Sequence, residues 1–244
     1  MIFSVVSKLL VLSHQLGGEV KVTVFSAKGG VGKTPISVNI ALDKEWAIGT
    51  NETYHIFDSL RVIPDNRILA VEPREEFPDL PADIDIVFDL SGTLGGDTAA
   101  SIRSAVAQSD VVLVPAQNEL KAINGAYHTI MEISDINPNV AVVVTKILKG
   151  KKEAFSDWRD SEDYKNVHGT LEKLTERELP AFPLKFSRGF DAIFEQEMSL
   201  NQMVGQGGLD GYAYKSVAKQ FDDIYQYLEQ LENQHGQQKR LVSV

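Results

Sequence analysis

The fold of this chain is decided by the stretch Ala27-Lys28-Gly29-Gly30-Val31-Gly32-Lys33-Thr34. It lies between an apolar run, Val20 to Phe25, and a segment of helical character that starts at Pro35. Glycines let the backbone wrap closely round an anion, and the first turn of the helix adds the positive end of its dipole. Lys33 is placed to reach the β- and γ-phosphates of a nucleotide. The sequence therefore predicts a P-loop between a strand and a helix.

A second signature fits the first. The predicted strand from Ile84 to Asp89 ends in an acid, and Gly92 follows three residues later. An aspartate at the carboxyl end of a buried parallel strand is placed to hold the water shell of a magnesium ion, and the Gly92 N–H is placed to sense the γ-phosphate. We therefore expect ATP with Mg²⁺, the metal being held by Thr34 and Asp89. The loop residues expected to contact the nucleotide are Gly29, Gly30, Val31, Gly32, Lys33, Thr34 and Pro35.

The loop departs from the common G-x-x-x-x-G-K-[ST] pattern, because Ala27 stands where glycine is usual and Lys28 follows it. In this respect Lys28 to Thr34 resembles the deviant Walker A loop of the ParA/MinD family, the partitioning and positioning ATPases of bacteria and archaea. The resemblance implies an ATP-sandwich homodimer in which Lys28 reaches the nucleotide of the partner. Lys28, Lys33, Asp89 and Glu52 are the expected catalytic residues.

Glu52 is chosen because the segment after the second strand departs from the family. ParA-like proteins carry an Asp-x-Asp-Pro segment there, whose carboxylates help to hold magnesium and orient the attacking water. This chain has Thr50-Asn51-Glu52-Thr53 instead, so both aspartates are missing. Glu52 is the first candidate for positioning the water and Asp58 the second, and a solvated loop acid is the alternative interpretation of Glu52.

Two later positions concern the base. Thr145 to Leu148 stands where GTPases carry an Asn-Lys-x-Asp motif, and Leu148 cannot accept the guanine N–H bonds that an aspartate accepts, so ATP is favoured over GTP. Lys146 is expected to bind the nucleotide, with a solvated lysine at a strand end as the alternative. Pro183 is expected to bind it too, because it stands where the family's adenine-contacting loop follows the last strand, here Pro180 to Phe186.

Strand and helix signals alternate along the chain, which predicts an α/β fold with a mostly parallel, twisted β-sheet flanked by helices. An apolar stripe predicts that the C-terminal helix packs on the sheet: Val217, Phe221, Ile224, Leu228 and Leu231. Strands are expected at Val20–Phe25, Trp46–Gly49, Ile68–Val71, Ile84–Asp89, Asp110–Gln117, Pro138–Val144 and Pro180–Phe186. Other helices are expected from Pro35 to about Glu45, and at Ala99–Gln108, Leu120–Ile133, Leu171–Glu178 and Arg188–Glu195.

Length and composition favour one domain. The 244 residues are 43% apolar, which suits a single core, and we assign residues 20–232 to a P-loop ATPase domain. Residues 1–19 are interpreted as an N-terminal appendage or a misannotated start rather than an export signal. Residues 233–244 are interpreted as a polar C-terminal tail. Cysteine is absent, which excludes disulfides, thiolate metal sites and the iron–sulfur relatives of this loop.

Charge bears on the partners. A net charge of -10 argues against a broadly basic protein that coats DNA. A local cluster at Lys149, Lys151 and Lys152 suits a DNA backbone, and solvated surface lysines are the alternative. The tail from Gln237 to Val244 has too few apolar residues for a membrane anchor. We expect a cytoplasmic protein that associates with the nucleoid if it binds DNA non-specifically.

The resemblance thus predicts a slow, switch-like ATPase whose ATP-bound dimer engages DNA or a partner protein of the centromere-binding or relaxosome type. The setting would be plasmid partition, plasmid stability or conjugative transfer, and the short first helix with Thr50-Asn51-Glu52 resembles the StbB-type plasmid-stability ATPases. Two alternatives remain open. One is a small-molecule kinase or ligase on the same fold, of the dethiobiotin synthetase type. The other is an ATP-binding module that does not hydrolyse ATP, which the missing aspartates allow.

Overall fold

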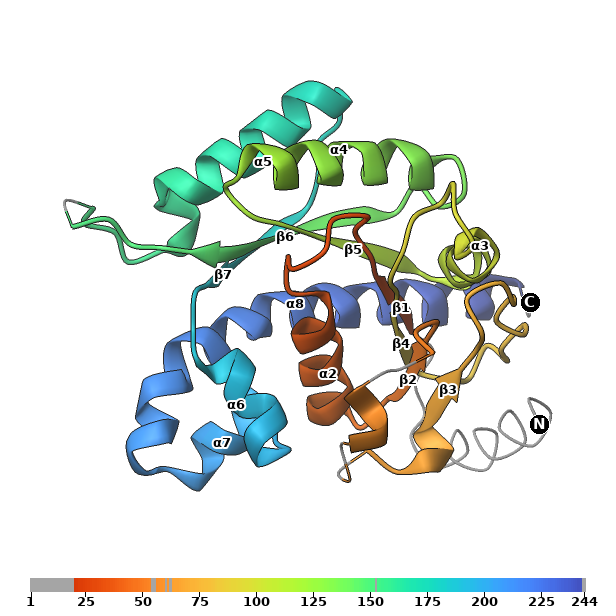
Figure 1. Cartoon of the computed structure of the whole chain (residues 1–244), viewed down its shortest axis with the longest axis horizontal. Coiled ribbons are helices and arrows are strands. Elements are labelled where there is room, and N and C mark those ends of the chain that lie inside the picture. The colour runs from red at the N-terminus through yellow and green to blue at the C-terminus, as the bar shows by residue number, and fades with distance from the viewer. Residues whose placement is uncertain (1–19, 54–55, 60, 62, 152, 243–244) are drawn as a thin grey trace.

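A seven-stranded sheet forms the centre of the described structure, and each of its strand pairings is parallel. The structure is a computed structural model that describes residues 20–53, 56–59, 61, 63–151 and 153–242. The strand order is β3-β2-β4-β1-β5-β6-β7 (Figure 1). The strands are β1 (Lys21–Val24), β2 (Ala47–Thr50), β3 (Ile68–Ala70), β4 (Ile86–Asp89), β5 (Val111–Ala116), β6 (Val140–Ile147) and β7 (Ala181–Lys185).

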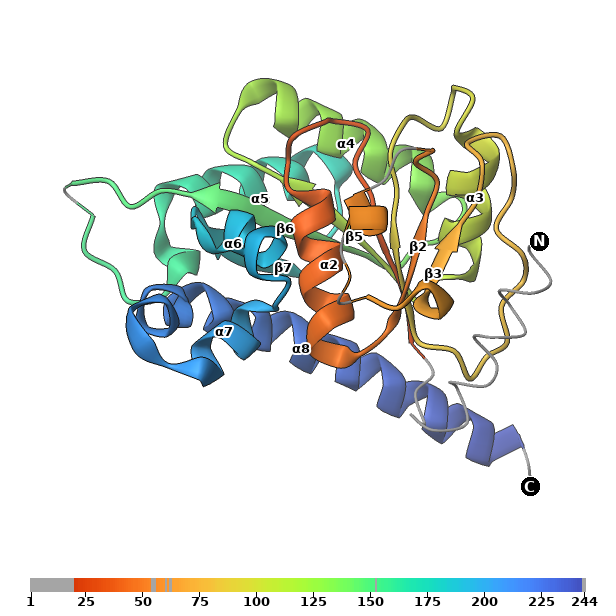
Figure 2. The ribbon, with the colours of Figure 1, turned by 60° about the horizontal axis from the view of Figure 1, so that its bottom comes forward.

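The strands read as continuous apolar runs because helices cover both faces of the sheet. All six residues of β5 are buried, with Val112 and Val114 facing one layer of helices and Val111 and Leu113 facing the other. One layer holds α3 (Ala99–Gln108), α4 (Leu120–Ser134) and α5 (Glu162–Thr175). The other holds α2 (Lys33–Lys44), α6 (Gly189–Gln196), α7 (Leu200–Gln206) and α8 (Gly208–Val242), as Figures 1 and 2 show.

Helix α2 follows the loop and is fixed by buried polar contacts to the helices beside it. The Asn39 side chain accepts a hydrogen bond from the Leu200 backbone N–H at 2.8 Å and donates one to the Tyr225 hydroxyl at 3.0 Å. That hydroxyl in turn donates to Asp43 at 2.6 Å. Burial, with the nearby Asp43 carboxylate, holds the pKa of Tyr225 well above its usual value, so it stays a neutral donor. These bonds tie α2 to α7 and α8, and so hold the helix that begins at the loop.

The expected fold is confirmed, and the sheet is wholly parallel rather than mostly parallel over the described strands. The stripe on the C-terminal helix does face the core, because Val217, Phe221, Ile224 and Leu228 are all buried in it. Helix α8 continues to Val242, so the proposed boundary at residue 232 falls inside a helix. Residues 1–19 lie outside the described part of the chain. No helix among the described residues is both long and apolar enough to cross a membrane.

Two local expectations are wrong. The helix expected at Leu171 to Glu178 instead begins at Glu162 and ends at Thr175, because the Ser161 side chain accepts a bond from the Tyr164 N–H and caps its start. Pro183 does not follow the last strand. It is the central residue of β7 and pairs with Val144 of β6.

Candidate functional site

The loop between β1 and α2 runs directly into the amino end of the helix. Gly30 has a φ of 75° and Gly32 a φ of 97°, a left-handed conformation that glycine adopts without strain. Gly32 is the residue that precedes α2, so the unpaired N–H groups of the first helical turn face the loop region. The predicted strand, loop and helix are therefore present, in the arrangement that favours binding of an anion.

Neighbouring elements anchor the loop on two sides. On α4, Thr129 accepts a hydrogen bond from the Ala27 N–H at 3.1 Å, and Gly125 leaves room for the Lys28 side chain, since a Cβ there would lie 3.1 Å from the Lys28 Cβ. On β6, the Thr145 hydroxyl donates to the Val31 carbonyl at 2.8 Å. Lys146 Nζ donates to the Gly30 carbonyl at 2.7 Å. The loop is thus preformed rather than free to take many shapes.

A cavity of about 530 Å³ opens beside this loop, a size typical of small-molecule sites. Four further segments complete its wall: a residue after β2, the residues after β4, the end of β6, and the turn from β7 into α6. The lining residues outside the loop are Glu52, Ser91, Gly92, Thr145, Lys146, Phe186, Ser187, Phe190 and Asp191. The cavity thus lies outside the carboxyl ends of the parallel strands, where open α/β sheets bind their ligands.

Lys33 lines the cavity, and the buried Asp89 is hydrogen-bonded to the lining residue Thr34. Burial lowers the pKa of Lys33, although the Asp89 and Glu52 carboxylates act to raise it. Asp89 is only 3% exposed, and burial raises its pKa to about 6 against hydrogen bonds from Thr34 and Ser37 that lower it. The Ser37 hydroxyl donates to Asp89 Oδ1 at 3.1 Å. Thr34 and Asp89 thus present oxygen donors side by side, as the predicted magnesium site requires.

This donor set fits magnesium bound with a nucleotide. Mg²⁺ in such sites keeps several waters and takes only one or two protein oxygens, the remaining ligands being phosphate oxygens. The Thr34 hydroxyl and the Asp89 carboxylate supply that number, and the Lys33 ammonium lies close enough to act on the Asp89 pKa.

Asn51 forms a contact that the sequence did not reveal. Its buried side chain bonds twice to Ser91 of the loop after β4, accepting from the Ser91 N–H at 2.9 Å and donating to its carbonyl at 3.0 Å. It also donates to the Ser101 hydroxyl of α3 at 2.9 Å. The next residue of the same loop is Gly92. Its φ of 97° and its contact with Thr98 leave no room for a Cβ. Asn51 therefore fixes the loop that borders the cavity.

The structure brings most, but not all, of the predicted site residues together. Glu52 and Lys146 line the cavity, and Lys28 is the residue between Ala27 and Ile36 that does not. Asp58 lies in the 3-10 helix η1 (Ile56–Ser59), and its side chain is outside the described residues. Pro183 is buried in β7 and lines a different cavity, so its assignment to an adenine loop is wrong.

Sequence reasoning missed Ser37, Phe186 and Phe190 as well as Asn51. Ser37 follows Lys33 by four residues, one helical turn, which was a usable signal that its hydroxyl shares the face that meets Asp89. The two phenylalanines flank the turn into α6 and form an apolar wall of the cavity. Phe186 is 57% exposed.

No protein-family model and no curated protein matches the sequence. Solved structures do match the fold. The ATP complex of a McdA variant from Cyanothece aligns with a TM-score of 0.55 at 13% identity, over 87% of this chain and 98% of that one. MinD, the cell division ATPase of Pyrococcus furiosus, aligns with a TM-score of 0.52 at 11% identity, over 84% and 99%. The fold is therefore that of the ParA/MinD-like P-loop proteins, as the loop from Lys28 to Thr34 predicts.

Proposed function

We propose that this protein binds ATP with magnesium in the loop cavity. The observation that carries the proposal is the meeting of the half-buried Lys33 ammonium, the Thr34 hydroxyl and the buried Asp89 carboxylate at the amino end of α2. Lys33 and the first N–H groups of the helix offer donors to the terminal phosphates. Thr34 and Asp89 would hold magnesium, which neutralises charge on the β- and γ-phosphate oxygens. Phe186 and Phe190 offer an apolar wall to the base.

Hydrolysis is proposed to be slow because few groups are available to orient the attacking water. Glu52 lines the cavity and acts electrostatically on Lys33, so it is close enough to the phosphate end to take this role. Asn51 cannot assist as a base, since it carries no charge and its side chain is already bonded to Ser91 and Ser101. The site therefore suits a switch, in which the bound nucleotide persists, better than rapid turnover.

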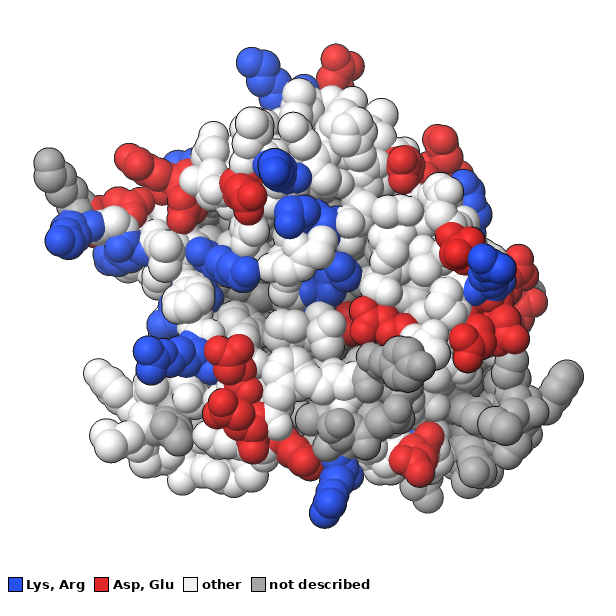
Figure 3. Space-filling view, viewed as in Figure 1, with Lys and Arg blue, Asp and Glu red and all other residues white. Residues whose placement is uncertain are grey.

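We further propose an ATP-dependent homodimer. Lys28 does not line the cavity of its own chain, and among the described residues its Nζ donates to the adjacent Gly29 carbonyl in an exposed bond at 3.1 Å. Basic side chains gather near the loop between β1 and α2 on the face shown in Figure 3. If two copies place their nucleotides face to face, a lysine from each side offsets the repulsion between the phosphate groups. Lys28 is half-buried along its stem, and its ammonium group is placed to serve in this way.

The proposed setting is plasmid partition, plasmid stability or conjugative DNA transfer in the cytoplasm. The partner would be a centromere-binding or relaxosome-type protein, or non-specific DNA. Of the basic cluster, Lys149 donates to the Phe155 carbonyl at 2.8 Å and lies 4.4 Å from the centre of its ring, whereas Lys152 is outside the described residues. A DNA contact by this cluster remains a prediction.

Two variants test the proposal. Asp89→Asn keeps the buried shape but removes the charge, so it should still bind ATP and lose at least about tenfold of its magnesium-dependent turnover. Lys28→Ala should bind ATP as a monomer and fail to dimerise. Light scattering with ADP, with ATP and with a slowly hydrolysed ATP analogue measures the mass, and phosphate release measures turnover.

The outcomes separate the parts of the proposal. Unchanged turnover in Asp89→Asn would remove this carboxylate from the site. If Lys28→Ala dimerises at the same ATP concentration as the wild-type chain, Lys28 has no role in the interface. ATP binding by the wild-type chain without measurable hydrolysis would instead favour a binding module.

A further inference from the structure

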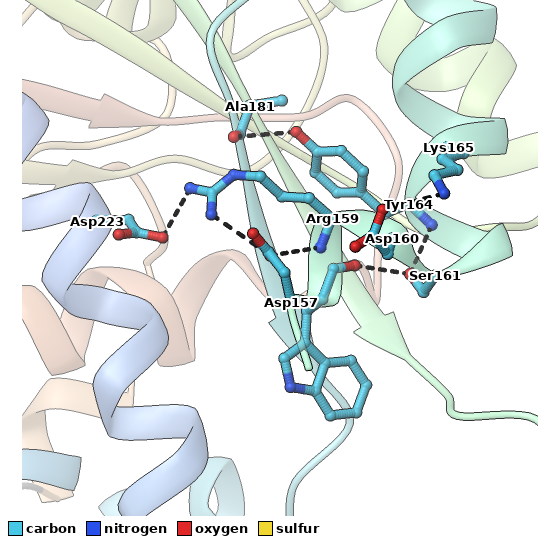
Figure 4. A network of polar contacts seen from close by, with 9 residues as sticks. Asp157, Arg159, Asp160, Ser161, Tyr164, Lys165, Ala181 and Asp223 are labelled. Atoms are coloured by element: carbon cyan, nitrogen blue, oxygen red, sulfur yellow. Dashed lines mark hydrogen bonds and ion pairs between the residues drawn. The ribbon is translucent and has the colours of Figure 1, made fainter. Parts of the chain in front are cut away.

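A second cavity, of about 770 Å³, lies at the outer edge of the sheet and shares no lining residue with the loop cavity. One wall is the segment from Ser156 to Arg159, which leads into the 3-10 helix η3 (Trp158–Asp160). The floor is the edge strand β7, through Pro183 and Lys185. The third wall is the face of α8 between Tyr212 and Asp223, and Figure 4 shows Asp223 on this helix facing Arg159. Nothing in the proposed ATPase reaction uses this cavity.

The two carboxylates of the cavity are held by a single arginine. Arg159 Nη2 lies 2.7 Å from Asp223 Oδ2, and its Nη1 lies 3.5 Å from Asp157 Oδ1. Asp157 also accepts the Arg159 backbone N–H at 2.9 Å. Figure 4 shows the guanidinium between the two acids. Their negative charge is thus partly offset before any ligand enters.

The remaining cations of the cavity have no such partners. Lys185, Lys215 and Lys219 all line it, and none forms an ion pair within 4.0 Å with any carboxylate of the described residues. Burial lowers the pKa of Lys185, whose ammonium lies 5.9 Å from the centre of the Trp158 ring. In a chain with a net charge of -10, these three lysines give the cavity a local excess of positive charge.

Gln220 supplies a second, independent observation, a buried donor without a partner among the described residues. Its side chain lines the cavity yet is only 7% exposed. Its Oε1 accepts the Lys185 backbone N–H at 3.0 Å, whereas its Nε2 has no hydrogen-bond partner among the described residues. A buried donor left without an acceptor costs about 1–3 kcal/mol. Because the Nε2 has almost no accessible surface, an acceptor oxygen from a ligand would remove that cost after a small rotation of the Gln220 side chain.

We propose that the cavity between Trp158, Lys185 and Gln220 is a second binding site that takes a phosphorylated small molecule. Ammonium groups and an amide donor together suit a ligand with several acceptor oxygens, and lysine is a common phosphate binder. The volume fits a ligand up to the size of a nucleotide, and the Trp158 ring offers a flat face to any ring the ligand carries.

The chain's two tryptophans allow a direct test. Protein labelled with 5-fluorotryptophan gives one ¹⁹F signal from Trp158 in the cavity and one from Trp46, which lines neither this cavity nor the loop cavity. The probes are inorganic phosphate, pyrophosphate and AMP, added to a Lys33→Ala chain so that the loop site contributes little. We expect a saturable shift of the Trp158 signal and none of the Trp46 signal, with Trp158→Phe assigning the two.

A matched pair of substitutions on α8 then locates the site. Gln220→Glu keeps an acceptor for the Lys185 N–H but replaces the free donor with a negative charge, so binding should weaken by at least about tenfold. Gln226→Glu makes the same charge change at an exposed position of α8 outside the cavity, and should stay within about twofold. If Gln220→Glu does not fold, the exposed pair Lys215→Gln and Lys219→Gln should give a similar loss.

Three results would overturn the proposal. One is the absence of any saturable Trp158 shift with all three probes at about 10 mM, a concentration that detects even binding of ~3 kcal/mol. Another is equal affinity in Gln220→Glu and Gln226→Glu. The third is a response to a short oligonucleotide but to none of the small probes, which would make the surface a nucleic-acid contact instead. Each result is independent of whether the loop cavity hydrolyses ATP.

Discussion

The two cavities of this molecule are built in different ways. The loop cavity takes half of its lining residues from one stretch of sequence, Ala27 to Ile36, and Glu52 is brought in after the strand β2. The cavity at β7 is assembled from three segments, around Trp158, Lys185 and Gln220, that are far apart in the chain. A binding site made by one motif can be recognised in a sequence. A site made by the meeting of distant segments needs the fold.

The two sites also use a lysine differently. Burial lowers the pKa of both Lys33 and Lys185. At Lys33 the carboxylates of Asp89 and Glu52 act in the opposite direction, so the ammonium is supported by charges in its own site. At Lys185 burial lowers the pKa and no carboxylate of the described residues acts in the opposite direction, and the Trp158 ring lies 5.9 Å from the ammonium.

The largest expected effect separates these two lysines. Lys33→Ala should weaken ATP binding by about 30-fold or more, because removing a charged partner from a half-buried phosphate contact costs at least ~2 kcal/mol. Lys185→Ala is the matched control, and it should leave ATP affinity within about twofold. Titration of both variants with a fluorescent ATP analogue measures the difference. Equal losses would mean that the two cavities are not independent.

An intermediate effect, on the free energy of unfolding, is expected from replacing Asn51, which connects the loop after β4 to α3. Asn51→Leu leaves the Ser91 N–H and carbonyl without their partner, which should lower the free energy of unfolding by about 1–3 kcal/mol. Urea denaturation measures it. The exposed Asn118→Leu serves as the control, with a change of less than about 0.5 kcal/mol. Similar changes in both variants would show that the buried bonds to Ser91 add little.

The smallest effect on stability is expected at the β7 cavity. Arg159→Ala removes ion pairs whose side chains are 38–51% exposed, and such pairs contribute about 0.2–1 kcal/mol. The same change leaves Asp157 and Asp223 without their cation, so phosphate binding in this cavity should fall while stability barely changes. Thermal unfolding and the ¹⁹F titration together check this. A stability loss above ~2 kcal/mol would identify Arg159 as a structural residue instead.

The fold was predictable to the extent that local patterns determine it. The alternation of strand and helix signals predicted the parallel sheet, and each of the seven strands overlaps the apolar segment that predicted it. The start of α5 was missed because charged residues surround Ser161, whose capping role depends on one backbone bond to Tyr164. Pro183 was misplaced because the resemblance assigned it to an adenine-contacting loop, although the expected strand from Pro180 to Phe186 contained it and an edge strand tolerates proline.

The candidate site was predictable where its residues belong to a local sequence motif. Lys33, Thr34 and Asp89 were found because the loop and the strand-end acid form a motif. Asn51 was seen only as the place of a missing aspartate, since its partners Ser91 and Ser101 lie 40 and 50 residues away. No spacing rule connects such residues, so their contact follows from strand order alone.

The misplaced Pro183 has a consequence for association between molecules. Exposed edge strands offer unpaired N–H and carbonyl groups that template aggregation. On β7, Pro183 has no N–H to offer, the Lys185 N–H is taken by Gln220, and the Ala181 carbonyl accepts the Tyr164 hydroxyl at 3.2 Å. A strand from another chain would therefore find few groups to pair with along this edge. Copies of the protein are steered away from pairing edge to edge through β7.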